Sequence, residues 1–470
     1  MAAISFLTVQ EIQIHHLPIR ARVPLKFGSE TLTGVTCARA RVVASARDGG
    51  RRIEGWGETP LSVQWVWPSP SPYAEREQAL MDFTAKIAAA WTGLPTEGHP
   101  LEFGHRFLEE VLPGMLRSFN TADRAGREPM PLLAALLCAS VLDQALHDAY
   151  GQAVGRPIYE TYKPPFLTQD LAHFLTPAPG SAVRFEGRFP QDFLAAKPSR
   201  RLKAWHLVGG VDALESCDLT GSEPADGHPV LLADWIRRDG LTCLKVKLRG
   251  NDAAWDYDRL CRVGRIAVAN GVEWLTADFN CTVRDPEYVN TILDRLREEA
   301  PRLYGMMLYV EQPFPYELEE DRIDTHSIAS RKPLFLDESA HDWRMIRLGR
   351  ELGWNGVALK TCKTQTGAIL SGCWARAHGM SLMVQDLTNP MLAQIPHVLL
   401  AAHMGTLMGV ETNGSQYFPA ASMEEAKLHP GLYRRSQGCV DLSTLQGNGY
   451  GMRVEEMTRS LPAPVACFGR

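Results

Sequence analysis

The stretch that decides the fold runs from residue 243 to residue 360 and contains five short apolar runs that each end in charged or polar residues. These runs are CLKVK (243–247), WLTAD (274–278), LYVEQ (308–312), LFLDE (334–338) and GVALK (356–360). Helical patterns lie between them, for example WDYDRLCRVGRIAVANG (255–271) and EYVNTILDRLREEA (287–300). Short strands that alternate with helices are typical of a parallel sheet covered by helices.

Three more candidate strands extend this pattern in both directions: AWHLV (204–208), LMVQD (382–386) and TLMGVE (406–411). Eight strands separated by helices over about 210 residues is the size of a (β/α) barrel. An open doubly wound sheet is the structural alternative, but it would need a glycine-rich phosphate loop after its first strand. The glycine-rich stretch GNGYG (447–451) follows the last candidate strand instead, so we favour the barrel.

The first 155 residues predict a different module. Residues 1–70 show alternating β patterns, residues 74–92 an amphipathic helix, and residues 131–150 an apolar helix that we expect to end at Gly151. Strands followed by helices indicate an α+β unit. Residues 160–202 have several prolines and little periodicity, which is typical of a long insertion or linker.

Composition excludes several classes of protein. The 470 residues include 49 Lys and Arg against 54 Asp and Glu, a net charge of −5, so we expect no nucleic-acid partner. We see no apolar run of about 18 residues and no signal-peptide pattern, so we expect no membrane partner and a cytoplasmic location. The ten cysteines show no C-x-x-C spacing, which favours free thiols over disulfides or structural zinc.

Charged residues stand at the carboxyl ends of nearly all the predicted barrel strands, where catalytic groups of this architecture lie. Asp278, Glu311 and the pair Asp337-Glu338 end three neighbouring strands. Carboxylates brought together in this way need a cation. Oxygen ligands alone suit Mg²⁺, and Mn²⁺ can substitute for it.

Three lysines complete the pattern. Lys245 and Lys247 are two residues apart and therefore share a strand face, whereas Lys360 ends a strand four places around the barrel. A carboxylate substrate held by the metal would have an amine on each side, which suits removal of a proton from one face of a carbon and its return to the other. The sequence therefore indicates proton abstraction α to a carboxylate.

The motifs LKVKL, TADFN, YVEQP, LFLDES and GVALK together resemble the enolase superfamily, and more closely its muconate lactonizing enzyme-like branch (the mandelate racemase/muconate lactonizing enzyme family). Two more segments share the resemblance, ASVLDQALHDAYGQAVGRPIYE (139–160) and QGNGYGMRVEE (446–456). It implies a (β/α)7β TIM-type barrel with an α+β capping domain. The chain would divide into 1–155 (cap), 156–202 (linker or insertion), 203–430 (barrel) and 431–470 (a tail that returns to the cap).

The resemblance also implies residue roles. Asp278, Glu311 and Asp337 would bind Mg²⁺, Lys247 and Lys360 would be the acid/base pair, and Lys245 would assist. Asn280 would contact the ligands or the substrate, and Glu338 would orient a lysine. The mandelate racemase dyad is absent, because strand 6 ends in Lys360 and strand 7 in Gln385-Asp386. Two departures leave the substrate open: no double glycine follows Lys360, and the 160–202 insertion is long.

Specificity in this family comes from cap loops, for which LKFGSETLTG (25–34) and GWGETPLSVQW (55–65) are the candidates. Lys26 and Phe27 could contact substrate or only pack at the seam between cap and barrel. Asp386 and Glu411 could bind a substrate ammonium group, or bond Lys360 or a backbone amide.

We therefore expect a Mg²⁺-dependent enzyme with a metal-stabilised enolate intermediate that acts as a racemase or epimerase on a small carboxylate. The alternatives are a dehydratase, a cycloisomerase or an o-succinylbenzoate-synthase-like lyase with the same first half-reaction, and a non-catalytic ligand-binding barrel. The family also implies a homo-oligomer.

Overall fold

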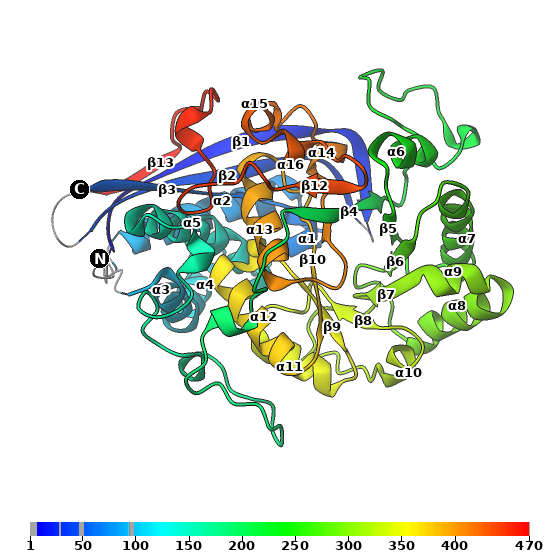
Figure 1. Cartoon of the computed structure of the whole chain (residues 1–470), viewed down its shortest axis with the longest axis horizontal. Coiled ribbons are helices and arrows are strands. Elements are labelled where there is room, and N and C mark those ends of the chain that lie inside the picture. Colours follow the sequence, from blue (N-terminus) through cyan, green and yellow to red (C-terminus); the bar gives the residue numbers. More distant parts are fainter. Residues whose placement is uncertain (1–6, 28–29, 47–50, 93, 95–97, 470) are drawn as a thin grey trace.

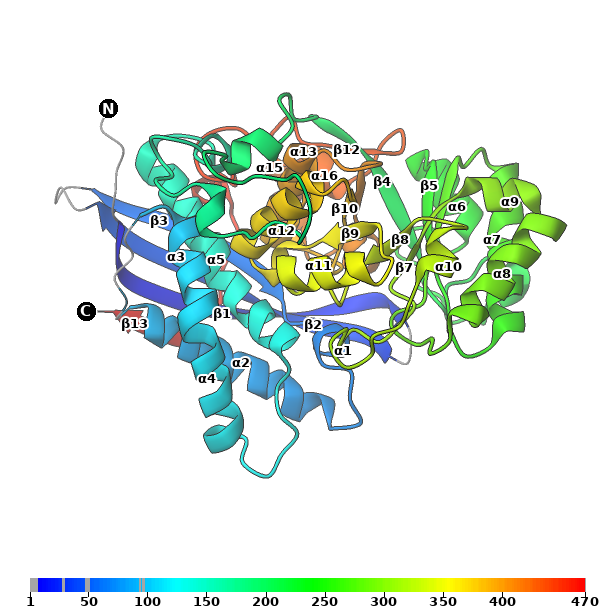
Figure 2. The ribbon, with the colours of Figure 1, turned by 90° about the horizontal axis from the view of Figure 1, so that it is seen from below.

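The computed structural model describes the chain except for residues 1–6, 28–29, 47–50, 93, 95–97 and 470. The first six residues of the predicted N-terminal strand, and residues 28 and 29 of the candidate cap loop, therefore lie outside the described part. The described chain forms a layered cap, to which both the first and the last strands belong, and a helix-covered parallel sheet beside it (Figures 1 and 2).

The cap is built on an antiparallel sheet with the strand order β13-β1-β2-β3. Its long hairpin consists of β1 (Leu7–Phe27) and β2 (Glu30–Ala46), and β3 (Arg52–Pro60) pairs with β2. Ile12 and Ile14 of β1 are buried while Gln13 between them is partly exposed, as the alternating sequence predicts. The apolar face of this sheet therefore turns toward the cap helices.

The helices of the cap are α1 (Val63–Val66), α2 (Tyr73–Trp91), α3 (Pro100–Arg106), α4 (Leu112–Ser118) and α5 (Leu132–Val154). The sequence analysis did not anticipate α3 and α4. Helix α5 crosses β3 closely because Gly57 has no side chain: a Cβ there would lie 2.1 Å from the Val141 carbonyl oxygen.

The prediction that the apolar helix ends at Gly151 is wrong. Helix α5 continues to Val154 and ends at Gly155, whose φ of 67° suits glycine. Gly151 instead marks a close approach, because a Cβ on it would lie 2.5 Å from the Gly449 Cα. Helix α5 is long and apolar enough to cross a membrane, but 94% of its most apolar window is buried inside the protein, so burial in the core explains its composition.

The segment that follows α5 carries only short 3-10 turns, as its irregular sequence predicts. It lies against the outside of the parallel sheet's helices. The indole of Trp374 donates a hydrogen bond to the Thr176 carbonyl at 2.9 Å, and the Ala195 N–H donates to the His403 carbonyl at 2.6 Å. This segment is therefore held in place by hydrogen bonds that involve its own backbone.

The second sheet contains eight parallel strands in the order β10-β9-β8-β7-β6-β5-β4-β11. Its strands are β4 (Arg201–Val208), β5 (Cys243–Lys247), β6 (Trp274–Asp278), β7 (Met307–Glu311), β8 (Leu334–Leu336), β9 (Gly356–Leu359), β10 (Ser381–Val384) and β11 (Val410–Glu411). The first and last strands along the chain, β4 and β11, pair with each other. The sheet is thus curled as in a TIM-type barrel.

Helices lie between successive strands of this sheet and around its outside (Figure 1). They are α6 (Leu232–Asp239), α7 (Ala253–Ala269), α8 (Pro286–Glu299), α9 (Pro301–Met306), α10 (His326–Ala329), α11 (Trp343–Glu351), α12 (Gln365–Ala377) and α13 (Gln394–Met404). The predicted six-residue strand TLMGVE is shorter than expected: only Val410 and Glu411 pair. The backbone at Gly409 is crowded, since a Cβ there would lie 2.0 Å from the Lys203 carbonyl oxygen.

The inside of the curled sheet is filled, not open. A cluster of buried side chains forms a plug: Trp205, Cys243, Tyr309, Phe335 and Met383. Lys245 lies two residues beyond Cys243 on the same face of β5. The charged groups therefore lie above this layer of apolar side chains, toward the carboxyl ends of the strands.

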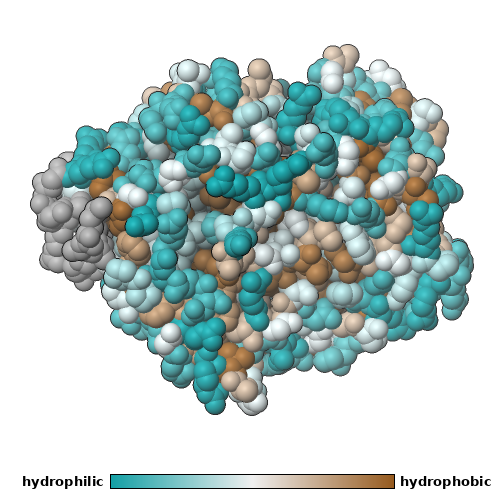
Figure 3. Space-filling model, viewed as in Figure 1, coloured by the Kyte–Doolittle hydropathy of each residue, from teal (hydrophilic) through white to brown (hydrophobic). Residues whose placement is uncertain are grey.

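The C-terminal segment connects the two parts. It contains α14 (Gly414–Tyr417), α15 (Met423–Leu428), α16 (Pro430–Tyr433), β12 (Cys439–Asp441) and β13 (Ala466–Gly469). Strand β12 pairs with β4 of the curled sheet, and β13 pairs with β1 of the cap. The outer face is mostly hydrophilic, with small scattered apolar patches, in the view of Figure 3.

Candidate active site

Three carboxylates end neighbouring strands, as the sequence predicts. Register pairs Lys247 of β5 with Asp278 of β6, and Asp278 with Glu311 of β7. Asp337 directly follows β8, in which Phe335 pairs with Glu311. All three carboxylates are at most 1% exposed. Backbone pairing thus brings them to the same end of the sheet.

Lys245 lies between these carboxylates and holds them together. Its Nζ is 2.6 Å from Glu311 Oε1, 2.9 Å from Asp278 Oδ2 and 3.2 Å from Glu411 Oε2. It also donates a hydrogen bond to Gln385 Oε1 at 3.0 Å. Burial alone would lower the pKa of Lys245, but the surrounding carboxylates outweigh it and raise that pKa well above its usual value. Lys245 therefore serves as a fixed positive charge.

The two lysines of the predicted acid/base pair line one cavity from strands four places apart. Lys247 Nζ contacts Asp278 Oδ2 at 2.5 Å and lies 5.9 Å from the centre of the Phe27 ring. Lys360 Nζ donates to the Asp386 carbonyl at 2.7 Å and lies 3.2 Å from Asp337 Oδ2. Each ammonium group is thus held by a carboxylate that the sequence predicts to bind metal.

A fourth buried lysine, which the sequence analysis did not assign to the site, lies beside Lys360. Lys363 Nζ donates to the Asp337 carbonyl and lies 3.8 Å from Asp337 Oδ1. The Trp65 ring of α1 lies over both amines, at 4.8 Å from Lys360 Nζ and 5.5 Å from Lys363 Nζ. Burial lowers the pKa of Lys363 despite the nearby carboxylate. The cap therefore contacts this side of the site directly through an aromatic ring.

The charges of the cluster do not balance. Four lysines face six carboxylates, and all ten side chains are buried: Lys245, Lys247, Lys360, Lys363, Asp278, Glu311, Asp337, Glu338, Asp386 and Glu411. Burial and the neighbouring Asp278 raise the pKa of Glu311 well above its usual value, and burial together with Asp337 raises the pKa of Glu338 to about 7. One divalent cation would supply the two missing positive charges.

Three buried oxygen atoms in this region have no hydrogen-bond partner: Asp337 Oδ1, Glu338 Oε2 and Asn280 Oδ1. Such atoms are costly unless a ligand or ion satisfies them. The donor set is entirely oxygen, which suits Mg²⁺. In the described part of the chain, no group of three His, Cys, Asp or Glu side chains is close enough together to hold a metal ion. In this cluster, lysine amines lie between the carboxylates. The residues fit a divalent cation in chemistry, charge and strand position.

The cavity between the cap and the strand ends is small, about 40 Å³. Lys245, Lys247, Lys360 and Asp337 form its polar floor. The other walls come from the cap hairpin, α1, β4 and the loop after β10. Of the two residues predicted to contact substrate from the cap loop, Phe27 lines the cavity and Lys26, the preceding residue, lies on the other face of the strand. The Lys26 carbonyl accepts a hydrogen bond from the Gly210 N–H at 2.9 Å.

The remaining predicted site residues have defined partners. Asp386 accepts hydrogen bonds from the backbone N–H groups of Asn389 at 2.7 Å and Asn413 at 2.5 Å. Glu411 accepts from Lys245 and, at 2.7 Å, from the Asn413 amide. Of the alternatives considered for these two carboxylates, the structure thus shows backbone amides for Asp386, whereas the contacts of Glu411 to Lys245 and to the Asn413 side chain were not among them.

Asn280 and Glu338 lie together at the edge of the cluster. The Asn280 N–H donates to Asp278 Oδ1 at 2.9 Å, and its side-chain amide donates to Glu338 Oε1 at 3.2 Å. Asn280 therefore connects two carboxylates, as expected for a residue that supports the ligands.

Two glutamines that the sequence analysis did not select support the carboxylates from below. The Gln385 amide donates to Glu311 Oε2 and to the Tyr309 hydroxyl, and Gln312 Oε1 accepts from the Asp337 N–H at 2.7 Å. Both are at most 1% exposed. In the sequence, only their positions next to charged strand ends could have indicated a role in the site. An uncharged amide side chain does not indicate which group it will hydrogen-bond.

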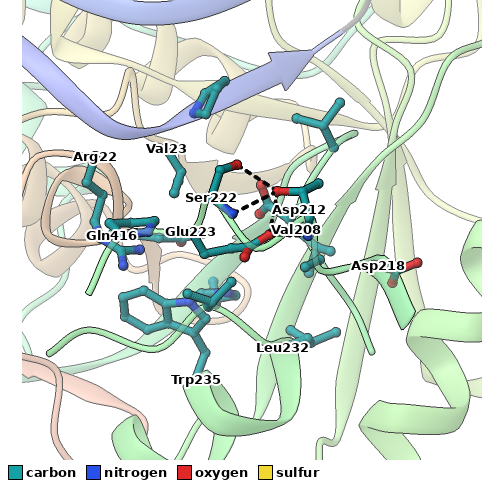
Figure 4. Close-up of a pocket in the computed structure, with 17 residues that line it drawn as sticks. Arg22, Val23, Val208, Asp212, Asp218, Ser222, Glu223, Leu232, Trp235 and Gln416 are labelled. Carbon is teal, nitrogen blue, oxygen red and sulfur yellow. Dashed lines mark hydrogen bonds between the residues drawn. The ribbon is translucent and has the colours of Figure 1, made fainter. Parts of the chain in front are cut away.

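A larger cavity of about 350 Å³ lies on the other face of β4 (Figure 4). His206 and Val208 face it, whereas Leu207 between them faces the lysine cavity. Arg22 of β1 and Trp235 of α6 close it. None of the lysines or predicted metal ligands lines this larger cavity, so size alone does not locate the chemistry.

A known family model matches most of the part of the chain that forms the curled sheet. Residues 230–457 match the family model described as "Enolase C-terminal domain-like". This part of the chain is therefore similar to the C-terminal domain of the enolase superfamily, and the resemblance noted in the sequence is confirmed. Comparison with the curated proteins finds no significant match.

Solved structures share the fold along nearly the whole chain. N-succinyl Arg/Lys racemase from Bacillus cereus is 14% identical, with a TM-score of 0.62, and the match covers 98% of this chain and 99% of that one. Muconate lactonizing enzyme from Pseudomonas fluorescens is 14% identical, with a TM-score of 0.61 and 97% of each chain covered. Dipeptide epimerase from Enterococcus faecalis, solved with Mg and a dipeptide, is 13% identical, with a TM-score of 0.61 and 94% and 99% covered. These likenesses show a cap plus TIM-type barrel.

Proposed function

We propose that this protein is a Mg²⁺-dependent racemase or epimerase that removes and returns the proton α to a carboxylate. One observation carries the proposal: Lys247 and Lys360, from strands four places apart, line one cavity with Asp337, and the buried Asp278 and Glu311 of the neighbouring strands contact the lining lysines Lys247 and Lys245. In this proposal Asp278, Glu311 and Asp337 hold the cation. When bound, a divalent cation would stabilise the negative charge that develops on the substrate carboxylate.

The lysines carry the proton steps in this proposal. The Nζ of Lys247 or of Lys360 takes the α-proton from one face of the carbon, and the other Nζ delivers a proton to the opposite face. Burial alone would lower the pKa of Lys360, but Asp337 and Glu411 together outweigh it and raise that pKa. Neutralisation of Asp337 would remove the larger of these two contributions and lower the pKa of Lys360 toward the working range. Lys245 keeps the carboxylates in register as a fixed charge.

The burial of the site supports the same chemistry. Lys247 and Lys360 are 8% and 4% exposed, and the cap covers them with Phe27 and Trp65. Exclusion of water strengthens the interactions of charges with the reacting group. We further propose a cytoplasmic homo-oligomer with a small-molecule carboxylate substrate and no nucleic-acid or membrane partner.

The test measures α-proton exchange with solvent deuterium in the presence of Mg²⁺, using a panel of chiral 2-substituted carboxylates. Exchange with inversion supports a racemase or epimerase, and expulsion of a β-leaving group would assign a lyase instead. Lys360→Ala should lower the exchange rate by several orders of magnitude without loss of the fold by circular dichroism. The exposed Lys427→Ala is the matched control, since its amine pairs with Glu424 away from the cavity. Normal exchange by Lys360→Ala would refute the two-base assignment.

A further inference from the structure

The walls of the lysine cavity differ sharply from its floor. Opposite the amines stand six apolar side chains: Leu25, Phe27 and Leu32 from the hairpin, Trp65 from α1, Leu207 from β4, and Leu387 from the loop after β10. Each of them is at most 9% exposed. The neutral polar side chains on these walls are Ser62, Thr388 and Asn413. A ligand with its carboxylate on the floor would therefore direct the rest of its body into apolar surroundings.

The carboxylates that line the cavity are already engaged by other donors, with which a substrate ammonium group would have to compete. One oxygen of Asp386 accepts a hydrogen bond from the Asn389 N–H, and the other accepts one from the Asn413 N–H. The two oxygens of Glu411 accept hydrogen bonds from Lys245 and from the Asn413 side-chain amide. Asp337 pairs with Lys360 through Oδ2, and its Oδ1, which has no hydrogen-bond partner and lies 3.8 Å from Lys363 Nζ, belongs to the proposed cation site. A buried ammonium without a partner carries a large desolvation cost.

The lysine ammonium groups that line the cavity are likewise already paired with carboxylates. Lys245 contacts three carboxylates, and Lys360 contacts Asp337 and a backbone carbonyl. Among the described residues that line this cavity, none is an arginine. A second carboxylate or a phosphate on the far end of the substrate would therefore be buried without a counter-charge.

We infer that the substrate is a monocarboxylate whose body beyond the α-carbon is apolar and uncharged. The inference rests on the proposed function, because it takes the polar floor as the place of the reacting carboxylate. At about 40 Å³ the cavity holds only a few water-sized volumes, so binding requires the side chains of the hairpin and of α1 to move apart. The surfaces that then contact the substrate body are the apolar faces of those elements.

The test uses the full chain with Mg²⁺ and three matched acids of similar length: 2-methylhexanoate, 6-amino-2-methylhexanoate and 2-methyladipate. Calorimetric titration measures binding, and deuterium incorporation measures α-proton exchange. We expect 2-methylhexanoate to bind at least about tenfold more tightly than the amino acid or the diacid. Each methylene added between 2-methylbutanoate and 2-methylhexanoate should tighten binding about fourfold.

A variant checks the location of the effect. Leu387→Asp places an unpaired carboxylate on the cavity wall, so it should weaken the binding of 2-methylhexanoate and strengthen that of 6-amino-2-methylhexanoate. Leu219→Asp, at a side chain that is 42% exposed and outside the cavity, should change neither. Circular dichroism confirms that both variants are folded.

The outcomes separate this inference from the proposed function. Tight binding of the alkyl acid without exchange would support the substrate class and overturn the proposed chemistry. Preferred binding and exchange of the amino acid or the diacid would overturn the substrate class and leave the chemistry intact. Failure of the alkyl acid to bind at all would overturn the substrate class.

Discussion

Replacement of Lys245 by methionine tests whether the buried carboxylates depend on a fixed positive charge. The ammonium group contacts Glu311, Asp278 and Glu411 at 2.6, 2.9 and 3.2 Å, and the side chain is 3% exposed. Methionine keeps much of the length and removes the charge. Removal of one partner from a buried ion pair costs about 3–5 kcal/mol, because the remaining charge stays buried. We expect Lys245→Met to lower the free energy of unfolding by at least that amount in metal-free buffer.

The assay is urea unfolding followed by tryptophan fluorescence. Lys203→Met is a matched control, because Lys203 Nζ also lies 2.6 Å from a glutamate oxygen, that of Glu273, but the two side chains are 38% and 51% exposed. Exposed pairs contribute about 0–1 kcal/mol. Equal losses for the two variants would refute the reasoning. Addition of Mg²⁺ should restore more stability to Lys245→Met than to the wild type, since the cation replaces the missing charge.

Three further predictions concern other parts of the molecule. Gly151→Ala should lower the unfolding free energy by about 1–3 kcal/mol because its Cβ meets the Gly449 backbone, whereas Gly305→Ala, with open space at the Cβ, should be nearly neutral in the same urea titration. Burial raises the pKa of Asp148 from 3.8 to about 7, so the unfolded chain loses this proton first as the pH rises. The wild type should therefore lose about 3 kcal/mol of unfolding free energy between pH 4 and pH 7 that Asp148→Asn does not lose, as pH-dependent unfolding would reveal. Treatment with EDTA should lower the melting temperature in a thermal scan and Mg²⁺ should restore it, because the buried cluster has two more carboxylates than lysines; an unchanged melting temperature would contradict the cation site.

The strands of the parallel sheet were predictable because each is a short apolar run between helices. CLKVK and WLTAD match β5 and β6 to the residue. Strand β11 was less predictable: only Val410 and Glu411 pair, and apolar character does not report the close approach of Gly409 to Lys203 just before them. The same limit applies to Gly151, which resembles a helix end in sequence but marks a contact with a segment almost 300 residues further along the chain.

The candidate site was predictable where charge coincides with a strand end. Asp278, Glu311 and Lys360 all meet this condition, and the structure brings them to one region. Lys363 lies in a short turn after the strand, and its approach to Asp337 depends on the path of that turn. Gln385 was not selected because its hydrogen bonds to Glu311 and Tyr309 come from strands distant in sequence.

The pairing of β1 with β13 has a consequence for the order of events during synthesis. Glu11 to Ile14 pair with residues 466–469, so that edge of the cap sheet stays open until the whole parallel sheet has left the ribosome. Open strand edges favour association with other chains. Until residues 466–469 pair with β1, this edge is therefore exposed to pairing with another chain, and a fusion partner attached close behind residue 469 would lie beside it.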